Sequence, residues 1–215
     1  MELSSETVIE TQEESMENKI EKEAENWMNL LLEENSEEIE VIIEIPRNSR
    51  IKYEYDKKLQ RMICDRVLTT PFAYFFNYGY IPNTLSNDGD PIDAVVLMDE
   101  EIYPGCSIQC RLLGYLETKD EKGDDPKLIL CPTSKVDPGC NHWKDVLDIP
   151  ITTLNKIKHF FSHYKDLEEG KFVEIGTFVG KEDAKQLVIE SRIQYFSNLM
   201  GESGFAVEEE NSPSS

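Results

Sequence analysis

Three carboxylates fall within six residues, at Asp88, Asp90 and Asp93, directly after an aromatic run at residues 74–80. Negatively charged side chains this close repel one another unless a cation lies between them. Mg²⁺ is the usual hard cation in such places, because one or two carboxylates and phosphate oxygens can hold it together. The spacing therefore predicts a divalent-metal site that handles phosphate.

A calcium loop of the EF-hand type does not explain this cluster. That loop needs a glycine at its sixth position and a bidentate glutamate at its twelfth, between two helices. Counted from Asp88, the sixth residue is Asp93 and the twelfth is Asp99. Pro91 and flanking segments of strand type also disagree with that loop.

Charged residues recur inside otherwise apolar segments of strand type, at Glu44, Lys52, Glu54 and Arg66. Any one of them is explained most simply by a position on the solvent face of a sheet. Lys52 and Glu54 are two residues apart, so they share one face of a strand. Cations and carboxylates gathered near an acidic cluster would suit a complex of metal and phosphate.

A second acidic segment, residues 120–127, carries three aspartates and one glutamate and ends in Lys127. Alone it is typical of an acidic hairpin turn. Combined with the first cluster, it could complete a cage for several metal ions. Tyr164 and Lys165, at the end of a predicted helix, add a hydroxyl donor and a positive charge of the kind that binds a phosphoryl oxygen.

The composition indicates one domain with an acidic leader. The chain has 215 residues, 39% of them hydrophobic, and a net charge of −21. This charge argues against nucleic acid and an anionic membrane surface as partners, because both require a basic patch. Residues 1–40 hold fourteen glutamates against two lysines. We predict an acidic, partly helical or disordered leader at 1–40, a catalytic domain at 41–200 and a disordered tail at 201–215.

Within the leader, Ile20, Ala24, Trp27 and Leu31 are spaced as on one face of a short amphipathic helix. This helix either docks on a partner or on the body of the protein, or belongs to a mostly solvated tail. The sequence shows no signal peptide, transit peptide or apolar run of about 18 to 20 residues. Its five cysteines are odd in number and form no C-x-x-C pair. We therefore expect a cytoplasmic protein with free thiols.

Short β-branched or alternating runs separated by turn signals predict strands that form a compact barrel. The predicted strands are residues 41–45, 51–55, 61–67, 94–98, 107–116 and 128–130. A helix with the apolar face Leu154, Ile157, Phe161 and Tyr164 is predicted to begin at residues 148–150 and to end at Gly170. A second is predicted from about residue 182 to 199. Its expected buried residues are Ala184, Leu187, Val188 and Ile193.

Several segments together resemble family I soluble inorganic pyrophosphatases, in the family's order and spacing. They are residues 88–94, which match its signature, and residues 44–46, 51–54, 65–66, 77–80 and 163–168. The resemblance covers about residues 41–171 and continues more weakly through the last helix. It implies an α+β fold, mainly β, with a five-stranded OB-like β-barrel and two flanking C-terminal helices. It also implies Mg²⁺-dependent hydrolysis of inorganic pyrophosphate to two phosphates, with several ions per site.

The same resemblance implies a role for each matching residue. Asp90 would be the general base, beside a nucleophilic water that bridges two metal ions. The metal ligands would be Asp88, Asp93, Asp120 and Asp125, with Glu44 acting through water. The ligands of phosphoryl oxygens would be Lys52, Arg66, Tyr78, Lys127, Tyr164 and Lys165. Glu54 and Tyr74 would support this set.

Three alternatives remain open on the sequence alone. The chain could be a catalytically weak relative that uses its leader for regulation or docking. It could also be a metal phosphoesterase that acts on a larger phosphate compound. A homo-oligomer is possible, because His159 and His163 lie one helical turn apart and match positions at a subunit interface in bacterial relatives. The two histidines could equally be surface residues of an amphipathic helix.

Overall fold

The computed structural model describes residues 38–202, and residues 1–37 and 203–215 lie outside the described part. The predicted leader helix and most of the predicted tail fall there and stay predictions. The described elements are, in chain order, β1 (Glu38–Ile45), β2 (Ile51–Asp56), β3 (Arg61–Val67), β4 (Asn77–Tyr80), β5 (Asp93–Val96), β6 (Ser107–Asp120), β7 (Gly123–Asp124), β8 (Lys127–Pro132), two short 3₁₀ helices (Pro138–Cys140 and Val146–Asp148), α2 (Ile151–His163), β9 (Val173–Gly180) and α3 (Lys181–Glu202).

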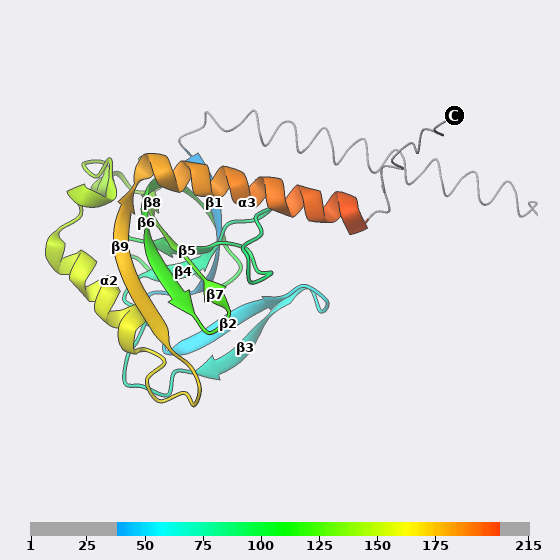
Figure 1. Ribbon diagram of the computed structural model, residues 1–215. Coiled ribbons are helices and arrows are strands. Elements are labelled where there is room, and N and C mark those ends of the chain that lie inside the picture. Colours follow the sequence, from blue (N-terminus) through cyan, green and yellow to red (C-terminus); the bar gives the residue numbers. More distant parts are fainter. Residues whose placement is uncertain (1–37, 203–215) are drawn as a thin grey trace, which may run out of the picture. The chain divides into compact units, whose positions relative to one another are not determined.

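A mixed sheet forms the centre of the fold. Its strands pair in the order β1-β4-β5-β8-β6-β7, and β9 also pairs with β6. The β5–β8 pair is parallel, and the other pairs of this sheet are antiparallel. Because β1 also pairs with β6, the path of pairings through β1, β4, β5, β8 and β6 returns to its start. Strands β2 and β3 form a separate two-stranded ribbon (Figure 1).

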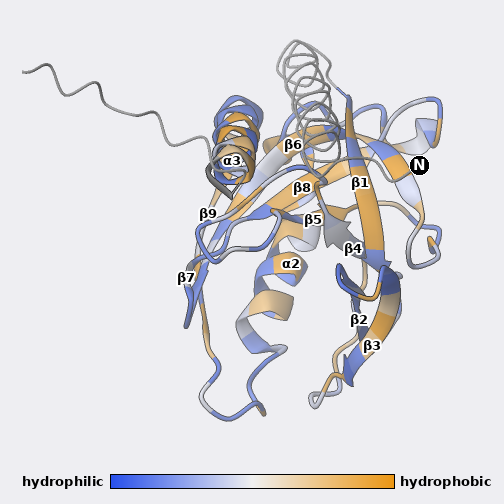
Figure 2. Cartoon of the chain, turned by 90° about the vertical axis from the view of Figure 1, so that its right-hand side faces the viewer, coloured by the Kyte–Doolittle hydropathy of each residue, from blue (hydrophilic) through white to orange (hydrophobic). Residues whose placement is uncertain are grey.

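The pattern of apolar residues explains how the central strands are buried. In β1 every second side chain is buried, from Ile39 to Ile45, whereas all six residues of β8 are buried. The hydropathy colours of Figure 2 show this apolar character along β1 and β8. The fold is therefore mainly β, with α2 and α3 packed beside the sheet (Figure 1), as predicted. The OB-like character of the expected barrel stays a prediction.

Helix α2 begins at Ile151, after Pro150, and its predicted apolar residues Leu154, Ile157 and Phe161 are buried. The prediction that this helix continues to Gly170 is wrong, because α2 ends at His163. Residues 164–170 instead form successive turns, in which the N–H of Glu168 donates to the carbonyl of Lys165 at 2.8 Å. These turns bring Lys165 and Glu168 to the cavity described below.

Helix α3 buries Ala184 and Val188 as predicted, but Ile193 is 45% exposed, so its predicted burial is wrong. Ala184, Val188 and Ser191 follow the helical spacing of four and three residues and face one side, whereas Ile193 lies roughly 200° round from Ser191. Ser191 is buried, and its hydroxyl donates to the carbonyl of Leu85 at 2.6 Å. No helix within residues 38–202 is long and apolar enough to span a membrane.

The strands at Asn77–Tyr80, Gly123–Asp124 and Val173–Gly180 were not among the predicted ones. The first is short and lies inside the aromatic run, and the last contains two glycines, so neither gives a clear alternating pattern. The other strands lie where expected, with ends shifted by up to four residues. The largest shift is in β6, which continues to Asp120.

We predict that Gly79→Ala prevents folding. A Cβ at Gly79 would overlap the carbonyl oxygen of Ile42 and lie 2.9 Å from the Cα of Ile43, and both are backbone atoms of the adjacent strand β1. We expect a loss of at least about 4 kcal/mol in the free energy of unfolding, measured with urea, or no folded protein. The control is Gly105→Ala, whose Cβ would have its nearest neighbour at 3.7 Å. Strain at its positive φ should cost only about 1 to 2 kcal/mol, and equal losses would contradict the prediction.

Candidate active site

One cavity of about 440 Å³ gathers all fourteen residues that the sequence assigns to a site. It lies among the β2–β3 ribbon, the acidic segments 88–93 and 120–127, and the turns after α2. The predicted residues that line it are Glu44, Lys52, Glu54, Arg66, Tyr74, Tyr78, Asp88, Asp90, Asp93, Asp120, Asp125, Lys127, Tyr164 and Lys165. The sequence thus predicted which residues meet, although their roles are a separate question.

A tight turn presents Asp88 and Asp90. The N–H of Gly89 donates to the carbonyl of Ser86 at 3.0 Å, and the N–H of Ser86 donates to the carbonyl of Asp90 at 2.8 Å. Gly89 has a φ of +89°, a backbone conformation that residues other than glycine adopt only with steric strain. The N–H of Asp90 also donates to Oδ1 of Asp88 at 3.1 Å. The turn therefore holds two carboxylates side by side at the cavity.

Parallel pairing brings Asp93 and Lys127 together, because they are opposite partners at the first residues of β5 and β8. Lys127 forms ion pairs with Asp93 and, at 2.5 Å, with Oδ2 of Asp125. The ammonium group is almost fully enclosed, since Lys127 is only 3% exposed. Burial raises the pKa of Asp125 to about 6 even though Lys127 acts to lower it. One buried cation thus serves two carboxylates.

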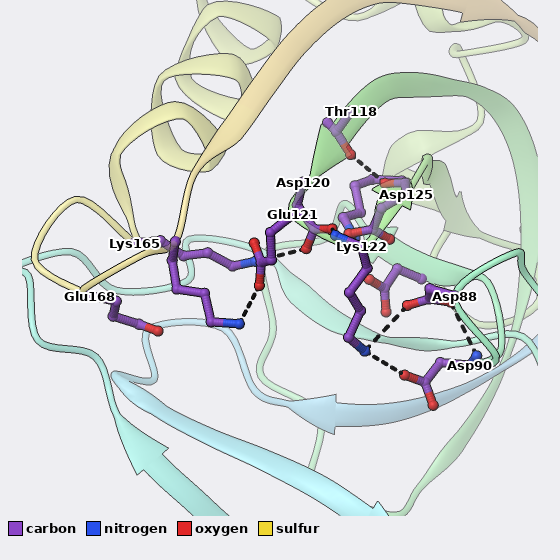
Figure 3. A network of polar contacts seen from close by, with 12 residues as sticks. Asp88, Asp90, Thr118, Asp120, Glu121, Lys122, Asp125, Lys165 and Glu168 are labelled. Atoms are coloured by element: carbon purple, nitrogen blue, oxygen red, sulfur yellow. Dashed lines mark hydrogen bonds and ion pairs between the residues drawn. The ribbon is translucent and has the colours of Figure 1, made fainter.

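Asp120, at the end of β6, has two donors. It accepts hydrogen bonds from the backbone N–H of Lys122 at 2.8 Å and from Nζ of Lys165 at 3.1 Å. Burial acts to raise the pKa of Asp120, but these hydrogen bonds outweigh it and the pKa is lowered. Figure 3 shows Lys165 reaching Asp120 from the turns after α2, and Lys122 reaching towards Asp88 and Asp90.

The β2–β3 ribbon supplies the cationic wall. Lys52 and Arg66 are direct partners across the two strands. The pairing then shifts by one residue, so that Asp65 is an extra residue in β3. Asp65 contacts Arg66 at 2.5 Å and Lys52 at 3.9 Å, which offsets the repulsion between these cations. Arg66 also contacts Glu168 at 3.2 Å, and Lys52 pairs with Glu54.

The three predicted tyrosines are buried hydrogen-bond donors. Tyr74, Tyr78 and Tyr164 are each less than a tenth exposed. Burial, with a smaller effect of nearby acidic groups, raises the pKa of each hydroxyl well above its ordinary value. The rings of Tyr74 and Tyr78 lie 5.5 Å apart and those of Tyr74 and Tyr164 lie 6.5 Å apart. The hydroxyls therefore remain protonated at neutral pH and can donate to an oxygen in the cavity.

Glu44 stands at an irregular point of β1. Ile43 pairs with Gly79 and Ile45 pairs with the adjacent Tyr78, so Glu44 has no opposite residue in β4. Its Oε1 accepts a hydrogen bond from the N–H of Tyr55 at 2.9 Å. Burial nevertheless raises the pKa of Glu44 to about 7, because this single donor and Lys52 do not compensate for the lost hydration.

A family model described as inorganic pyrophosphatase matches residues 41–196. The chain belongs to this family. The earlier resemblance to family I soluble inorganic pyrophosphatases is thereby confirmed, over a longer part of the chain than the motifs alone covered.

Individual relatives agree with this membership. The inorganic pyrophosphatase of Xylella fastidiosa (strain 9a5c) is 46% identical over 164 residues, which are 76% of this chain and 92% of that protein. The inorganic pyrophosphatase of Sulfolobus acidocaldarius is 47% identical over 150 residues, which are 70% and 87%.

Solved structures of the family share the fold. The inorganic pyrophosphatase from Helicobacter pylori has a TM-score of 0.73 and 45% identity, over 74% of this chain and 94% of that one. The inorganic pyrophosphatase from Thermus thermophilus has a TM-score of 0.73 and 37% identity, over 75% and 93%.

Several residues of the pyrophosphatase cavity were not assigned a role from the sequence. They are Tyr55, Lys57, Tyr80, Pro91, Glu121, Lys122, Glu168 and Lys171. Signals for three of them were present, because Glu121 and Lys122 lie inside the second acidic segment and Glu168 closes a family motif. Lys171 pairs with Glu121 across 50 residues of sequence, and local spacing cannot reveal such a contact.

Membership of this family implies a divalent metal cofactor. The donors present fit such an ion, because nine carboxylates and no thiol or imidazole line the cavity, and carboxylate oxygens are the preferred ligands of hard cations. Within residues 38–202 no three of these groups already converge as a cation site. Ammonium groups stand between them instead, so a divalent ion would compete with lysines for the carboxylates.

We predict that Glu44→Gln stabilises the chelator-treated protein at pH 8 but not at low pH. The pKa of Glu44 is about 7 when folded against 4.5 otherwise, so the buried group costs stability above pH 7. The cost disappears as the pH falls from 7 to 4.5. We expect a gain of about 2 to 3 kcal/mol in the free energy of unfolding at pH 8, measured with urea, and little at pH 5.

Glu174→Gln is the control for that variant, because Glu174 is an exposed glutamate on β9 and loses the same charge. A gain from Glu44→Gln that is equal at pH 8 and pH 5 would contradict the assignment to a buried ionised carboxylate.

Proposed function

We propose that this chain hydrolyses inorganic pyrophosphate to two phosphates, with Mg²⁺ as its cofactor. The observation that supports it most directly is that one cavity unites five carboxylates for cations with four cationic side chains for phosphate. Relatives at 46% and 47% identity carry the name inorganic pyrophosphatase. The side chains of the cavity and the names of these relatives together support the proposed function.

The metal ligands in this proposal are Asp88, Asp93, Asp120 and Asp125, with Glu44 acting through water. Bound Mg²⁺ ions would neutralise pyrophosphate and lower the pKa of a coordinated water. The carboxylates contribute by their placement, since Asp93 begins β5, Asp120 ends β6 and Asp125 lies in the short connection before β8. Lys127 keeps two of them close together before any ion binds, because its ammonium offsets their repulsion.

Asp90 is the proposed general base. Its side chain is 64% exposed, so it can meet a water at the mouth of the cavity. The adjacent turn holds it next to Asp88, and its ion-pair partner Lys122 is itself 54% exposed. Asp90 would accept the proton of the attacking water as the bond to phosphorus forms.

Four cations and two hydroxyls would hold the phosphoryl oxygens. Lys52 and Arg66 reach in from the ribbon, Lys127 from the start of β8, and Lys165 from the turns after α2. Tyr78 and Tyr164 would donate hydrogen bonds, with Glu54 and Tyr74 in support. These donors would stabilise charge on the leaving phosphate, an effect of about 3 to 4 kcal/mol for a well-placed donor.

The finer features predicted from the sequence accompany this proposal. The returning path of strand pairings supports an OB-like barrel as the scaffold. All five cysteines are free, which supports the predicted cytoplasmic location. The rings of His159 and His163 lie 4.3 Å apart beside Phe72, and these residues remain the predicted contact of a homo-oligomer.

We predict that Asp90→Asn lowers the turnover of pyrophosphate at least about 100-fold, because the amide cannot accept the proton. Phosphate release is measured with Mg²⁺ and again with excess chelator, which should abolish it in the wild type. The control is Asp124→Asn, which removes an equal charge from an exposed residue that lies outside the cavity. We expect this control to keep wild-type turnover.

Absence of phosphate release from folded wild-type protein would overturn the proposed function and favour the regulatory or docking relative. Comparable release from nucleotides or phosphomonoesters would favour the broader phosphoesterase. Full activity of Asp90→Asn would leave the reaction in place but remove Asp90 from the role of base.

A further inference from the structure

Lys122 lies between the two carboxylates at the mouth of the cavity. Its Nζ is 3.7 Å from Oδ2 of Asp88 and 3.4 Å from Oδ2 of Asp90. Figure 3 shows the side chain extending from the segment after β6 towards the turn that carries both aspartates. One ammonium group therefore faces a proposed metal ligand and the proposed general base together.

The backbone of Lys122 is fixed, but its ammonium is free to move. The N–H of Lys122 donates to Oδ1 of Asp120 at 2.8 Å, which ties the start of the side chain to another proposed ligand. The side chain itself is 54% exposed. A four-carbon stem anchored at one end can swing its charge out into solvent at little cost, in contrast to Lys127, whose side chain is enclosed.

Charge repulsion explains why such a cation matters here. Asp88 and Asp90 lie in one tight turn, and both face a cavity that already contains Asp93, Asp120 and Asp125. Lys122 offsets the repulsion at the mouth in the way that Lys127 offsets it deeper inside. A divalent ion that binds these oxygens more closely would repel the ammonium and take over that task.

We propose that Lys122 is a displaceable counter-ion, which holds Asp88 and Asp90 until a divalent cation binds and thereby sets the metal concentration at which the site fills. The inference rests on the proposed metal-dependent function, and it concerns a residue that neither the family motifs nor the assigned site contains. Lys122 would thus lower the affinity of the site for a divalent metal ion. It would also stabilise the acidic cavity when no metal ion is bound.

Titration calorimetry with Mg²⁺ alone, without pyrophosphate, tests this competition. We expect Lys122→Ala to bind Mg²⁺ about 3- to 10-fold more tightly than the wild type, because the ion no longer displaces an ammonium from two partly exposed ion pairs. Lys122→Arg keeps the positive charge and should stay within about twofold of the wild type. The gain should shrink at high salt, because the group is exposed.

The matched control is Lys119→Ala. Lys119 is exposed on β6, three residues before Lys122, carries the same charge and forms no ion pair within residues 38–202. It reports the effect of net charge alone, and we expect a change below about twofold. Melting temperatures add a second readout: Lys122→Ala should melt below the wild type in chelator, and saturating Mg²⁺ should remove most of that difference.

Equal Mg²⁺ affinity of Lys122→Ala and Lys119→Ala would overturn the inference while leaving the proposed function intact. Weaker binding by Lys122→Ala would also overturn it, since Lys122 would then support the ion instead of competing with it. Absence of any Mg²⁺ binding by the wild type would overturn both the inference and the proposed cofactor. Phosphate release from pyrophosphate, measured separately, shows whether the enzyme activity itself fails.

Discussion

Neutralisation of closely spaced carboxylates is the constraint on which this structure depends. An ionised carboxylate loses hydration when it is enclosed, and two of them side by side repel each other as well. Nearly every acidic group of the cavity therefore has a cation beside it. The pairs are Asp88 and Asp90 with Lys122, Asp93 and Asp125 with Lys127, Asp120 with Lys165, Glu54 with Lys52, Glu168 with Arg66, and Glu121 with Lys171.

Glu44 shows what happens where this compensation is weaker. Its carboxylate has a backbone hydrogen bond from Tyr55 but no ion pair within residues 38–202, and burial raises its pKa to about 7. Asp120, with a lysine ammonium and a backbone N–H as donors, has a lowered pKa although it is also buried. The number and kind of donors decide the charge state of each acid, and the fold decides the donors.

The sequence predicted which residues line the cavity better than it predicted the contacts between them. Charged residues such as Lys52 and Arg66 stand out within apolar segments, and a family motif surrounds Asp90, so all fourteen assigned residues could be predicted to share one cavity. The role of Lys122 could not, because it depends on how far a flexible side chain reaches from one loop to another. Ion pairs between distant segments leave no local pattern.

The same limit applies to the fold. Strands with regular alternation, such as β1, were predicted to within a few residues. Strand β9 was missed because its glycines weaken the pattern and its place is set by pairing with β6. Helix α2 ends earlier than Gly170 predicts because the following turns carry Lys165 and Glu168 to the cavity. Tertiary contacts overrode the local signal in both places.

Some ion pairs and hydrogen bonds of this fold join parts of the chain that are far apart. The order of synthesis therefore limits when the site can form. Arg66 meets Glu168 across 102 residues, and Leu85 is bound by Ser191 across 106. Asp88 and Asp90 precede Lys127 and Lys165 in the chain, so a nascent chain that has not yet reached these lysines lacks the cations that neutralise the cavity. The substrate site therefore matures late in synthesis, after α2 has been made and the turns beyond it have docked.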